Sequence, residues 1–272
     1  YPGIIFIAEI YDIGLYRPYI DAGFDYLYDK VNLYDTLRAV ECDNVSAARI
    51  TSCWQTVEGI AGKMLNFLEN HDEQRFASPQ YAGDAHRVMP SLVVSSMINT
   101  GPMMIYGGQE LGEPALDSEG YSGYDGRTSI FDYFSMPTVR ARLNGGRCDG
   151  AMPDDIVKLR ADYAKVLSLC NSEPAISDGR FFDLMYVNYH NPGVDPHRDY
   201  VFMRADDNDL LLIAVNFGCE DKEMSINIPR HAFDVLGFPE GRARMKERLK
   251  GGRAVTKELR ADKPFTLNVP AH

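Results

Sequence analysis

The 272-residue chain is long enough for one large domain or two modest ones. Its composition, 45% hydrophobic and 25% charged, is typical of a folded globular protein. A net charge of −11 argues against nucleic acid as the main ligand, and no apolar run reaches the roughly 18 residues of a membrane-spanning helix. These values remain compatible with a neutral ligand such as a sugar.

The cysteines are five in number and scattered, without the spacing of a disulfide framework or of a metal site: Cys42, Cys53, Cys148, Cys170 and Cys219. An odd, dispersed set is typical of free thiols in a reducing compartment, which favours a cytoplasmic location. The chain opens on Tyr1 rather than Met and reaches a predicted strand almost at once. We therefore expect it to be a piece of a longer protein, so that a missing targeting signal says little about location.

The first part of the chain alternates short apolar runs with helical patterns. These runs predict strands at 4–10, 24–29, 64–70 and 103–110. Helices are predicted near and between them, at 15–23, 33–42, 54–63 and 83–100. Strands that alternate with helices in this way are typical of parallel β/α units.

The composition and the hydrophobic pattern of the sequence change after Glu113. Residues 113–153 are rich in Gly, Tyr, Asp and Pro and predict a long loop, whereas residues 153–172 have the apolar spacing of a helix. From about residue 179, short strand candidates are separated by polar turns, a pattern typical of an antiparallel β-sandwich. We therefore predict two parts, a β/α domain over 1–178 and an all-β domain over 179–272.

Three of the four predicted parallel strands end in polar side chains: Glu9, the set Asn70-His71-Asp72, and the pair Gln109-Glu110. In parallel β/α barrels the carboxyl ends of the strands meet at one mouth, so all three ends are expected to open onto one face. Glu110 is explained equally well as a cap for a following helix. Asn-His-Asp directly after an apolar strand is harder to explain as a cap, because it forms a directed set of donors and acceptors.

These segments carry a family resemblance. Residues 67–75, FLENHDEQR, resemble the Phe-x-x-Asn-His-Asp motif of the α-amylase family of glycoside hydrolases, and residues 4–12, IIFIAEIYD, are similar to its strand-five motif. Residues 98–114 resemble its strand eight, and residues 126–133, GRTSIFDY, resemble the loop that follows. The resemblance implies the second half of a (β/α)8 barrel, strands five to eight, followed by the family's C-terminal β-domain.

The resemblance also implies roles for individual residues. Glu9 matches the general acid/base, a task that needs a carboxyl group kept protonated near neutral pH. Asp72 matches the carboxylate that grips sugar hydroxyls and stabilises the oxocarbenium-like transition state, and His71 matches the sugar-binding histidine beside it. Asn70 and Arg75 fall within the substrate-binding set, where they are expected chiefly to hold the loop and its charges.

The chain departs from the family pattern in one decisive respect. Retaining hydrolysis needs a second carboxylate about 5 to 5.5 Å from the acid. The family carries it in a Gly-x-Arg-x-Asp segment ahead of the acid, and only eight residues precede Glu9. A calcium-binding Asn of strand three is missing too, so any calcium site is expected in an absent N-terminal half and no cofactor within this chain. The chain alone is expected to be inactive on α-glucans such as starch, glycogen or maltooligosaccharides.

Several alternatives remain at this stage. The same machinery serves transglycosylases such as branching enzymes, and a non-catalytic carbohydrate-binding relative is a different class of protein. A metal site in an unrelated barrel has little support, because no His/Asp/Glu set has ligand spacing along the sequence. Half a barrel would leave two bare strand edges, which predicts association with another copy or with the missing half.

Overall fold

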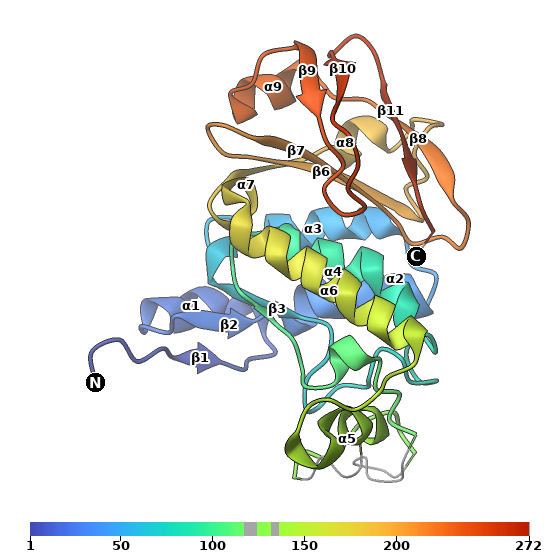
Figure 1. Ribbon diagram of the computed structural model, residues 1–272. Helices are drawn as coiled ribbons and strands as arrows, with labels where there is room; N and C mark the ends of the chain where they lie inside the picture. The colour runs from blue at the N-terminus through green and yellow to red at the C-terminus, as the bar shows by residue number, and fades with distance from the viewer. Residues whose placement is uncertain (117–123, 132–135, 272) are drawn as a thin grey trace.

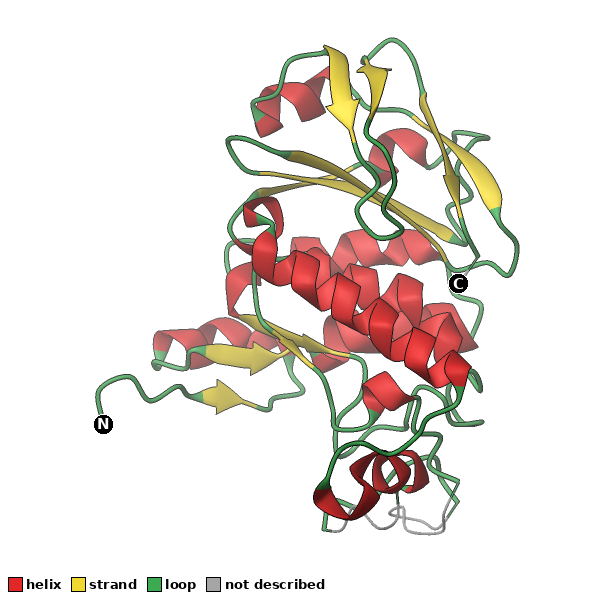
Figure 2. Cartoon of the chain, viewed as in Figure 1, coloured by secondary structure: helices red, strands yellow, loops and turns green. Residues whose placement is uncertain are grey.

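The computed structural model describes residues 1–116, 124–131 and 136–271 (Figure 1). The parallel strands come first in the chain, the long helix α6 (Asp154–Ser172) follows, and the antiparallel strands come last (Figure 2). The remaining helices of the first part are α1 (Tyr16–Asp21), α2 (Asp35–Cys42), α3 (Ile50–Thr56), α4 (Val88–Met97) and α5 (Pro137–Leu143).

The parallel sheet contains β1 (Ile7–Ala8), β2 (Tyr26–Tyr28), β3 (Met64–Phe67) and β4 (Met103–Met104), in the order β1-β2-β3-β4. All three pairings are parallel, as the alternation of strands and helices predicts. Each strand is shorter than its apolar run. β1 and β4 are the extreme cases, with two residues each.

The outer edge of the sheet along β1 is apolar and accessible. Ile4, Ile5, Phe6 and Ile7 are each 50–60% exposed. Within the described ranges, β1 and β4 each have a strand neighbour on one side only. Unpaired strand edges of this kind favour pairing with another chain, and self-association through them stays a prediction.

Two helix predictions differ from the structure. The helix predicted at 54–63 starts earlier and ends at Thr56, and the chain then turns through Gly59, whose φ of +79° suits a residue without a side chain. The long loop predicted at 113–153 contains α5, which begins at Pro137, a residue whose fixed φ suits the first helical turn. Residues 117–123 and 132–135 of this predicted loop lie outside the described residues.

Helix α6 packs across the middle of the molecule (Figure 1). It starts with Asp154 and Asp155, whose negative charges are favourable at a helix N-terminus. Leu159, Tyr163 and Val166 form its buried stripe and belong to one continuous core with residues of the parallel and antiparallel parts. In the part of the chain that the structure covers, no helix combines the length and hydrophobicity that a membrane span requires.

The last part of the chain forms three small antiparallel sheets within the described residues. They are β5 (Arg180–Asp183), β6 (Asp199–Ala205) and β7 (Leu210–Asn216); β8 (Lys222–Ile226) with β11 (Phe265–Val269); and β9 (Gly241–Met245) with β10 (Val255–Leu259). Short helices α7 (Pro174–Ser177), α8 (Met185–Asn188) and α9 (Arg230–Leu236) accompany them. β5, α8 and α9 were not predicted, and the arrangement of the sheets as a sandwich stays a prediction.

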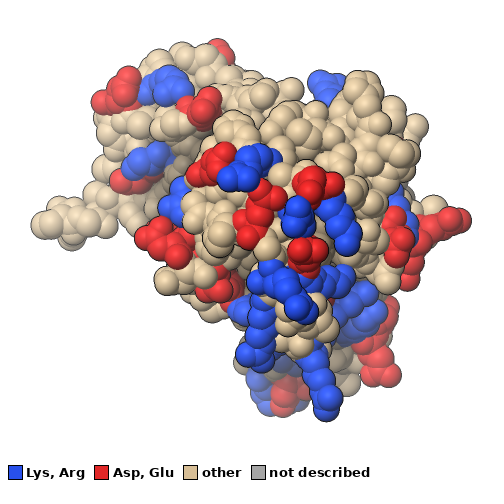
Figure 3. All heavy atoms as spheres, turned by 90° about the horizontal axis from the view of Figure 1, so that it is seen from above, with Lys and Arg blue, Asp and Glu red and all other residues tan. Residues whose placement is uncertain are grey.

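The surface of this part is mixed in charge. Strand β9 alternates exposed Arg242 and Arg244 with half-buried Ala243 and Met245, the period of two that a half-buried strand shows. Figure 3 looks onto this end of the molecule and shows Lys and Arg side chains gathered along one margin, among acidic groups. The basic character is therefore local in a chain whose net charge is negative.

Glu41 on α2 is a buried carboxyl group between α2 and α4. Its Oε1 accepts a hydrogen bond from Ser91 Oγ at 2.9 Å, and its Oε2 lies 3.2 Å from Arg87 Nη2. Burial raises the pKa of Glu41 from 4.5 to about 7, and the contacts with Ser91 and Arg87 oppose part of that rise.

The raised pKa of Glu41 predicts a pH dependence of stability. Between pH 4.5 and about 7 the folded chain keeps a proton on Glu41 that the unfolded chain releases, so the free energy of unfolding falls as pH rises through this window. The full effect is roughly 3 kcal/mol. Urea unfolding of the Glu41→Gln variant at pH 5 and pH 8 should show a smaller loss than the unmodified chain, whereas the exposed Glu220→Gln control should match the unmodified chain. Equal losses in Glu41→Gln and in the unmodified chain would contradict this account.

Candidate active site

The carboxyl ends of β1 and β3 bring together three residues from distant parts of the chain. Glu9 directly follows β1, and His71 and Asp72 lie in the loop that begins after β3. One side-chain oxygen or nitrogen atom of each lies within 4.8 Å of the other two, and His71 Nε2 is 3.4 Å from Asp72 Oδ2. We refer to these three residues as the mouth.

The mouth is open to solvent. Glu9 is exposed, and the side chains of His71 and Asp72 are 37% and 40% exposed. Buried carboxyl groups with partners usually serve the fold, whereas these three can all be reached by a ligand. The mouth can therefore offer two carboxyl groups and an imidazole to one bound molecule.

Tyr11 is a member of this site that sequence reasoning missed. Its hydroxyl donates to Glu9 Oε1 at 2.5 Å. Burial and the nearby Glu9 carboxylate raise the pKa of Tyr11, so its hydroxyl keeps its proton at neutral pH and remains a donor. A tyrosine two residues after a strand-end carboxylate is the sequence signal that could have identified it.

A groove of about 430 Å³ adjoins the mouth. It is lined by Tyr11, Lys30, Val31, Asp72, Glu73 and Arg127. Lys30 Nζ lies 2.9 Å from Asp35 Oδ1 and 3.3 Å from Glu73 Oε1, and Arg127 donates to the backbone carbonyl of Asp72. Its volume falls within the ~300–1,000 Å³ of small-molecule sites, and its lining combines donors and acceptors beside an aromatic ring.

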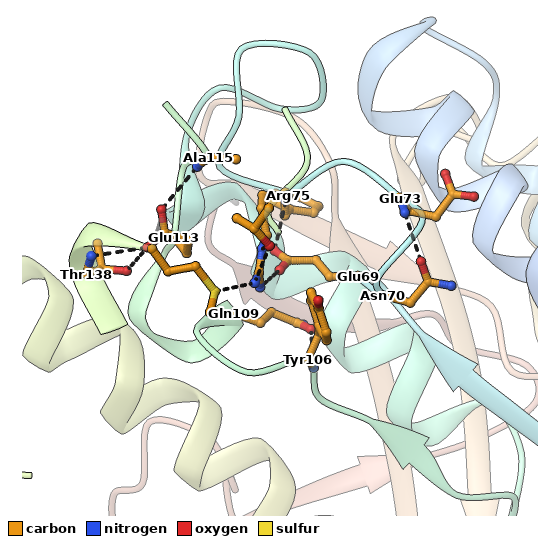
Figure 4. Close-up of polar contacts among 12 residues, drawn as sticks. Glu69, Asn70, Glu73, Arg75, Tyr106, Gln109, Glu113, Ala115 and Thr138 are labelled. Carbon is orange, nitrogen blue, oxygen red and sulfur yellow. Dashed lines mark hydrogen bonds and ion pairs between the residues drawn. The ribbon is translucent and has the colours of Figure 1, made fainter. Parts of the chain in front are cut away.

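Asn70 shapes the loop that carries the mouth. Its Oδ1 accepts hydrogen bonds from the backbone N–H groups of Asp72 and Glu73, both at 2.9 Å. Figure 4 shows the second of these bonds. Because Asn70 is only 1% exposed, it fixes the turn rather than presenting its own side chain to a ligand.

The position of Arg75 differs from the sequence-based assignment, which placed this residue among the substrate-binding residues. Its side chain is 1% exposed, and its Nη1 lies 2.9 Å from Glu69 Oε2. Nε and Nη2 both donate to Thr128 Oγ1, and the guanidinium stacks 4.2 Å from the Tyr106 ring centroid (Figure 4). Arg75 therefore does not reach the mouth but joins the loop after β3 to the segment after β4.

The polar pair after β4 also serves the fold. Gln109 is buried and donates to the Tyr163 hydroxyl of α6 at 3.1 Å. Glu110 lies in the first turn of a short 3-10 helix, η6 (Gln109–Leu111). This position is close to the helix cap that the sequence analysis gave as the alternative for Glu110. Neither belongs to the mouth.

Folding changes the expectation about metals. Along the sequence no His/Asp/Glu set had ligand spacing, but the structure brings Glu9, His71 and Asp72 close enough to hold a metal ion. The same exposed groups also suit hydrogen bonding to a sugar. A metal ion and a sugar would therefore be bound by the same three residues, not at two separate sites.

Residues 145–149, Gly-Gly-Arg-Cys-Asp, repeat the spacing of the segment that carries the nucleophile in the resembling family. Their structural setting differs. They lie in and after an exposed 3-10 turn, η8 (Asn144–Gly146), and the side chains of Arg147 and Asp149 are 68% and 60% exposed. Asp149 contacts Arg147 and Asn144 rather than the mouth, so it adds no further carboxylate to Glu9 and Asp72 there.

Comparison with known proteins gives a fold. No protein-family model and no curated protein matches the sequence. Solved structures do match: an α-amylase from Geobacillus thermoleovorans complexed with acarbose has a TM-score of 0.68 and 14% identity, over 100% of this chain and 52% of that one. The chain has the fold of α-amylase-type glycoside hydrolases.

Two further structures agree with this fold. The maltogenic α-amylase AmyB from Thermotoga neapolitana has a TM-score of 0.64 and 16% identity, over 98% of this chain and 52% of that one. A debranching enzyme from Nostoc punctiforme has a TM-score of 0.60 and 17% identity, over 99% of this chain and 49% of that one. This chain therefore spans about half the length of the structures it matches.

Proposed function

We propose that this chain is part of an α-amylase-type retaining glycosidase that acts on α-glucans. The observation that carries the proposal is the grouping of Glu9, His71 and Asp72 after the carboxyl ends of two strands, β1 and β3, of one parallel sheet. Solved structures with the same fold include complexes with acarbose, maltose and maltotriose, which supports an oligosaccharide as the ligand.

The proposed roles follow from the chemistry of the groups. Glu9 donates a proton to the glycosidic oxygen as the bond to the anomeric carbon breaks, and later takes a proton from the attacking water. The Tyr11 hydroxyl holds the Glu9 carboxyl group in place through the 2.5 Å hydrogen bond. Asp72 and His71 bind sugar hydroxyls, and Asp72 stabilises the positive charge that develops in the transition state.

Within the described residues, the mouth has two carboxylates, Glu9 and Asp72. A retaining mechanism that uses Asp72 as transition-state stabiliser needs a third carboxylate, the nucleophile, to form the bond to the anomeric carbon. We propose that the third carboxylate comes from outside this chain. A transglycosylase would use the same groups with a sugar hydroxyl in the place of water.

The proposal predicts binding without turnover for this chain alone. Isothermal titration with maltotriose should give saturable binding, and a reducing-sugar assay on starch and maltotriose should show no product above background. Absence of binding would contradict the assignment of the mouth to an α-glucan. Clear turnover would contradict the absence of the nucleophile while leaving the substrate assignment in place.

A further inference from the structure

Arg204 on β6 is a buried arginine away from the mouth. The residue is 1% exposed. Its Nε donates to the carbonyl of Ala175 at 3.0 Å, and its Nη2 donates to the carbonyls of Ile176 at 2.6 Å and Gly179 at 2.9 Å. These bonds use three of the five N–H groups of a guanidinium, and the two on Nη1 find no acceptor among the described residues.

The charge of Arg204 is also unbalanced. The side chain forms no ion pair within the described ranges, and the nearby carboxylate of Asp183 accepts instead from Thr51, Trp54 and Tyr200. Burial lowers the pKa of Arg204 to about 10, which still leaves the group positively charged at neutral pH. A buried charge without a counter-ion costs several kcal/mol, which carbonyl dipoles offset only in part.

Arg204 lines a cavity of about 290 Å³ between the two parts of the chain. The walls come from the parallel part, through α3 and the turns after α3 and α4, and from the antiparallel part, through residues at the start of β5 and on β6. Nη1 has no hydrogen-bond partner among the described residues, but it is not fully enclosed. It therefore lies at a surface that water can reach. Because Arg204 is otherwise buried, that surface is the cavity wall.

A second donor faces the same cavity. Asn99 is 7% exposed, and its Oδ1 accepts from the backbone N–H of Gly101 at 2.9 Å. Its Nδ2 donor has no protein partner among the described residues. Asp29 and Glu58 also line the cavity; Asp29 is 2% exposed, and its carboxyl group already accepts from Asn32 and Tyr16. The cavity therefore offers a cation and an amide donor together with the Glu58 carboxylate, which can accept from hydroxyl groups.

We propose that this cavity binds a small organic oxyanion that also carries hydroxyl groups, a hydroxy-carboxylate or a sugar phosphate. Arg204 Nη1 is its charged anchor, and Asn99 Nδ2 is a second donor. The mouth residues do not line the cavity, so the two sites are separate. A ligand held by residues from both parts of the chain would stabilise the folded state by binding to it alone.

The test is thermal unfolding of the unmodified chain with citrate, inorganic phosphate or glucose 6-phosphate, against sodium chloride at equal ionic strength. A specific site predicts a rise in Tm of several degrees that begins at low concentration and then grows with the logarithm of concentration. Citrate and phosphate also stabilise proteins generally, but that effect grows in proportion to concentration and is small at low concentration. A logarithmic rise with citrate alone identifies a carboxylate site, and a logarithmic rise with the phosphates alone identifies a phosphate site.

Two variants link the response to the cavity. Asn99→Asp keeps the oxygen that accepts from Gly101 and adds a carboxylate that can pair with Arg204, so it should abolish the logarithmic rise. Arg204→Met should abolish the rise too. If loss of the three hydrogen bonds to carbonyl groups prevents Arg204→Met from folding, the Asn99→Asp variant alone decides the test. Arg244→Ala, which removes an exposed cation on β9, should keep the full response.

Three results would overturn the proposal. The unmodified chain would show no logarithmic rise beyond chloride with any of the three anions, or Asn99→Asp would keep the full rise, or Arg244→Ala would lose it. The last result would assign the effect to general surface charge rather than to the cavity.

Discussion

The Asp72→Asn variant is expected to bind maltotriose at least about tenfold more weakly than the unmodified chain. A hydrogen bond to a charged group contributes about 1.5–3 kcal/mol, and the substitution removes the charge while keeping the size of the side chain. The backbone N–H of Asp72 still donates to Asn70 and its carbonyl still accepts from Arg127, so the loop should keep its shape. Isothermal titration calorimetry measures the change.

The matched control for this prediction is Asp149→Asn. Asp149 is an exposed carboxylate on the turn after α5, and its contacts are with Asn144 and Arg147. Its substitution should leave maltotriose binding unchanged. Equal affinities of the Asp72→Asn variant and the unmodified chain would show that Asp72 does not contact the sugar.

The Arg75→Met variant is expected to lower the free energy of unfolding by about 3–5 kcal/mol, because removal of one partner of a buried ion pair leaves the other charge uncompensated. Glu69 and Arg75 are 2% and 1% exposed at their side chains. Glu69 would keep only the backbone N–H of Phe76 as a donor at 2.8 Å. Urea unfolding, with the midpoint and the slope both fitted, measures the loss.

Two comparisons sharpen the Arg75 prediction. The double variant Glu69→Gln with Arg75→Met should recover part of the loss, because no charge is then left unpaired. Arg230→Met removes one partner of ion pairs that are largely exposed and should cost less than about 1 kcal/mol. An Arg75→Met variant as stable as Arg230→Met would contradict the structural role assigned to the buried pair.

The sequence predicted the parallel order of elements and the residues of the mouth for a physical reason. The carboxyl ends of parallel strands lie on one edge of a sheet, so Glu9 and the His71-Asp72 pair could be expected to meet without knowledge of distances. The length of β1 could not be predicted in the same way. Its apolar run is long, but pairing with β2 involves only Ile7 and Ala8.

The roles of residues that depend on partners far away in the chain could not be predicted from the sequence. Arg75 stands three positions after Asp72 and looked like part of the binding set, but Glu69, Thr128 and Tyr106 enclose it completely. Arg204 lies in a strand that is buried along its whole length, and its sequence gives no hint of a cavity lined by α3 and the turn after α4. In both cases, contacts with residues tens of positions away in the sequence determine the role of the arginine.

The most direct test of the account is an NMR titration of the chain with maltotriose that follows the histidine ring resonances. The sequence contains six histidines, and only His71 belongs to the mouth. The account predicts a saturable shift of the His71 ring resonances with the other five unchanged. Saturable binding that leaves His71 unaffected, or that shifts a histidine elsewhere instead, would contradict the claim that the mouth is a sugar site.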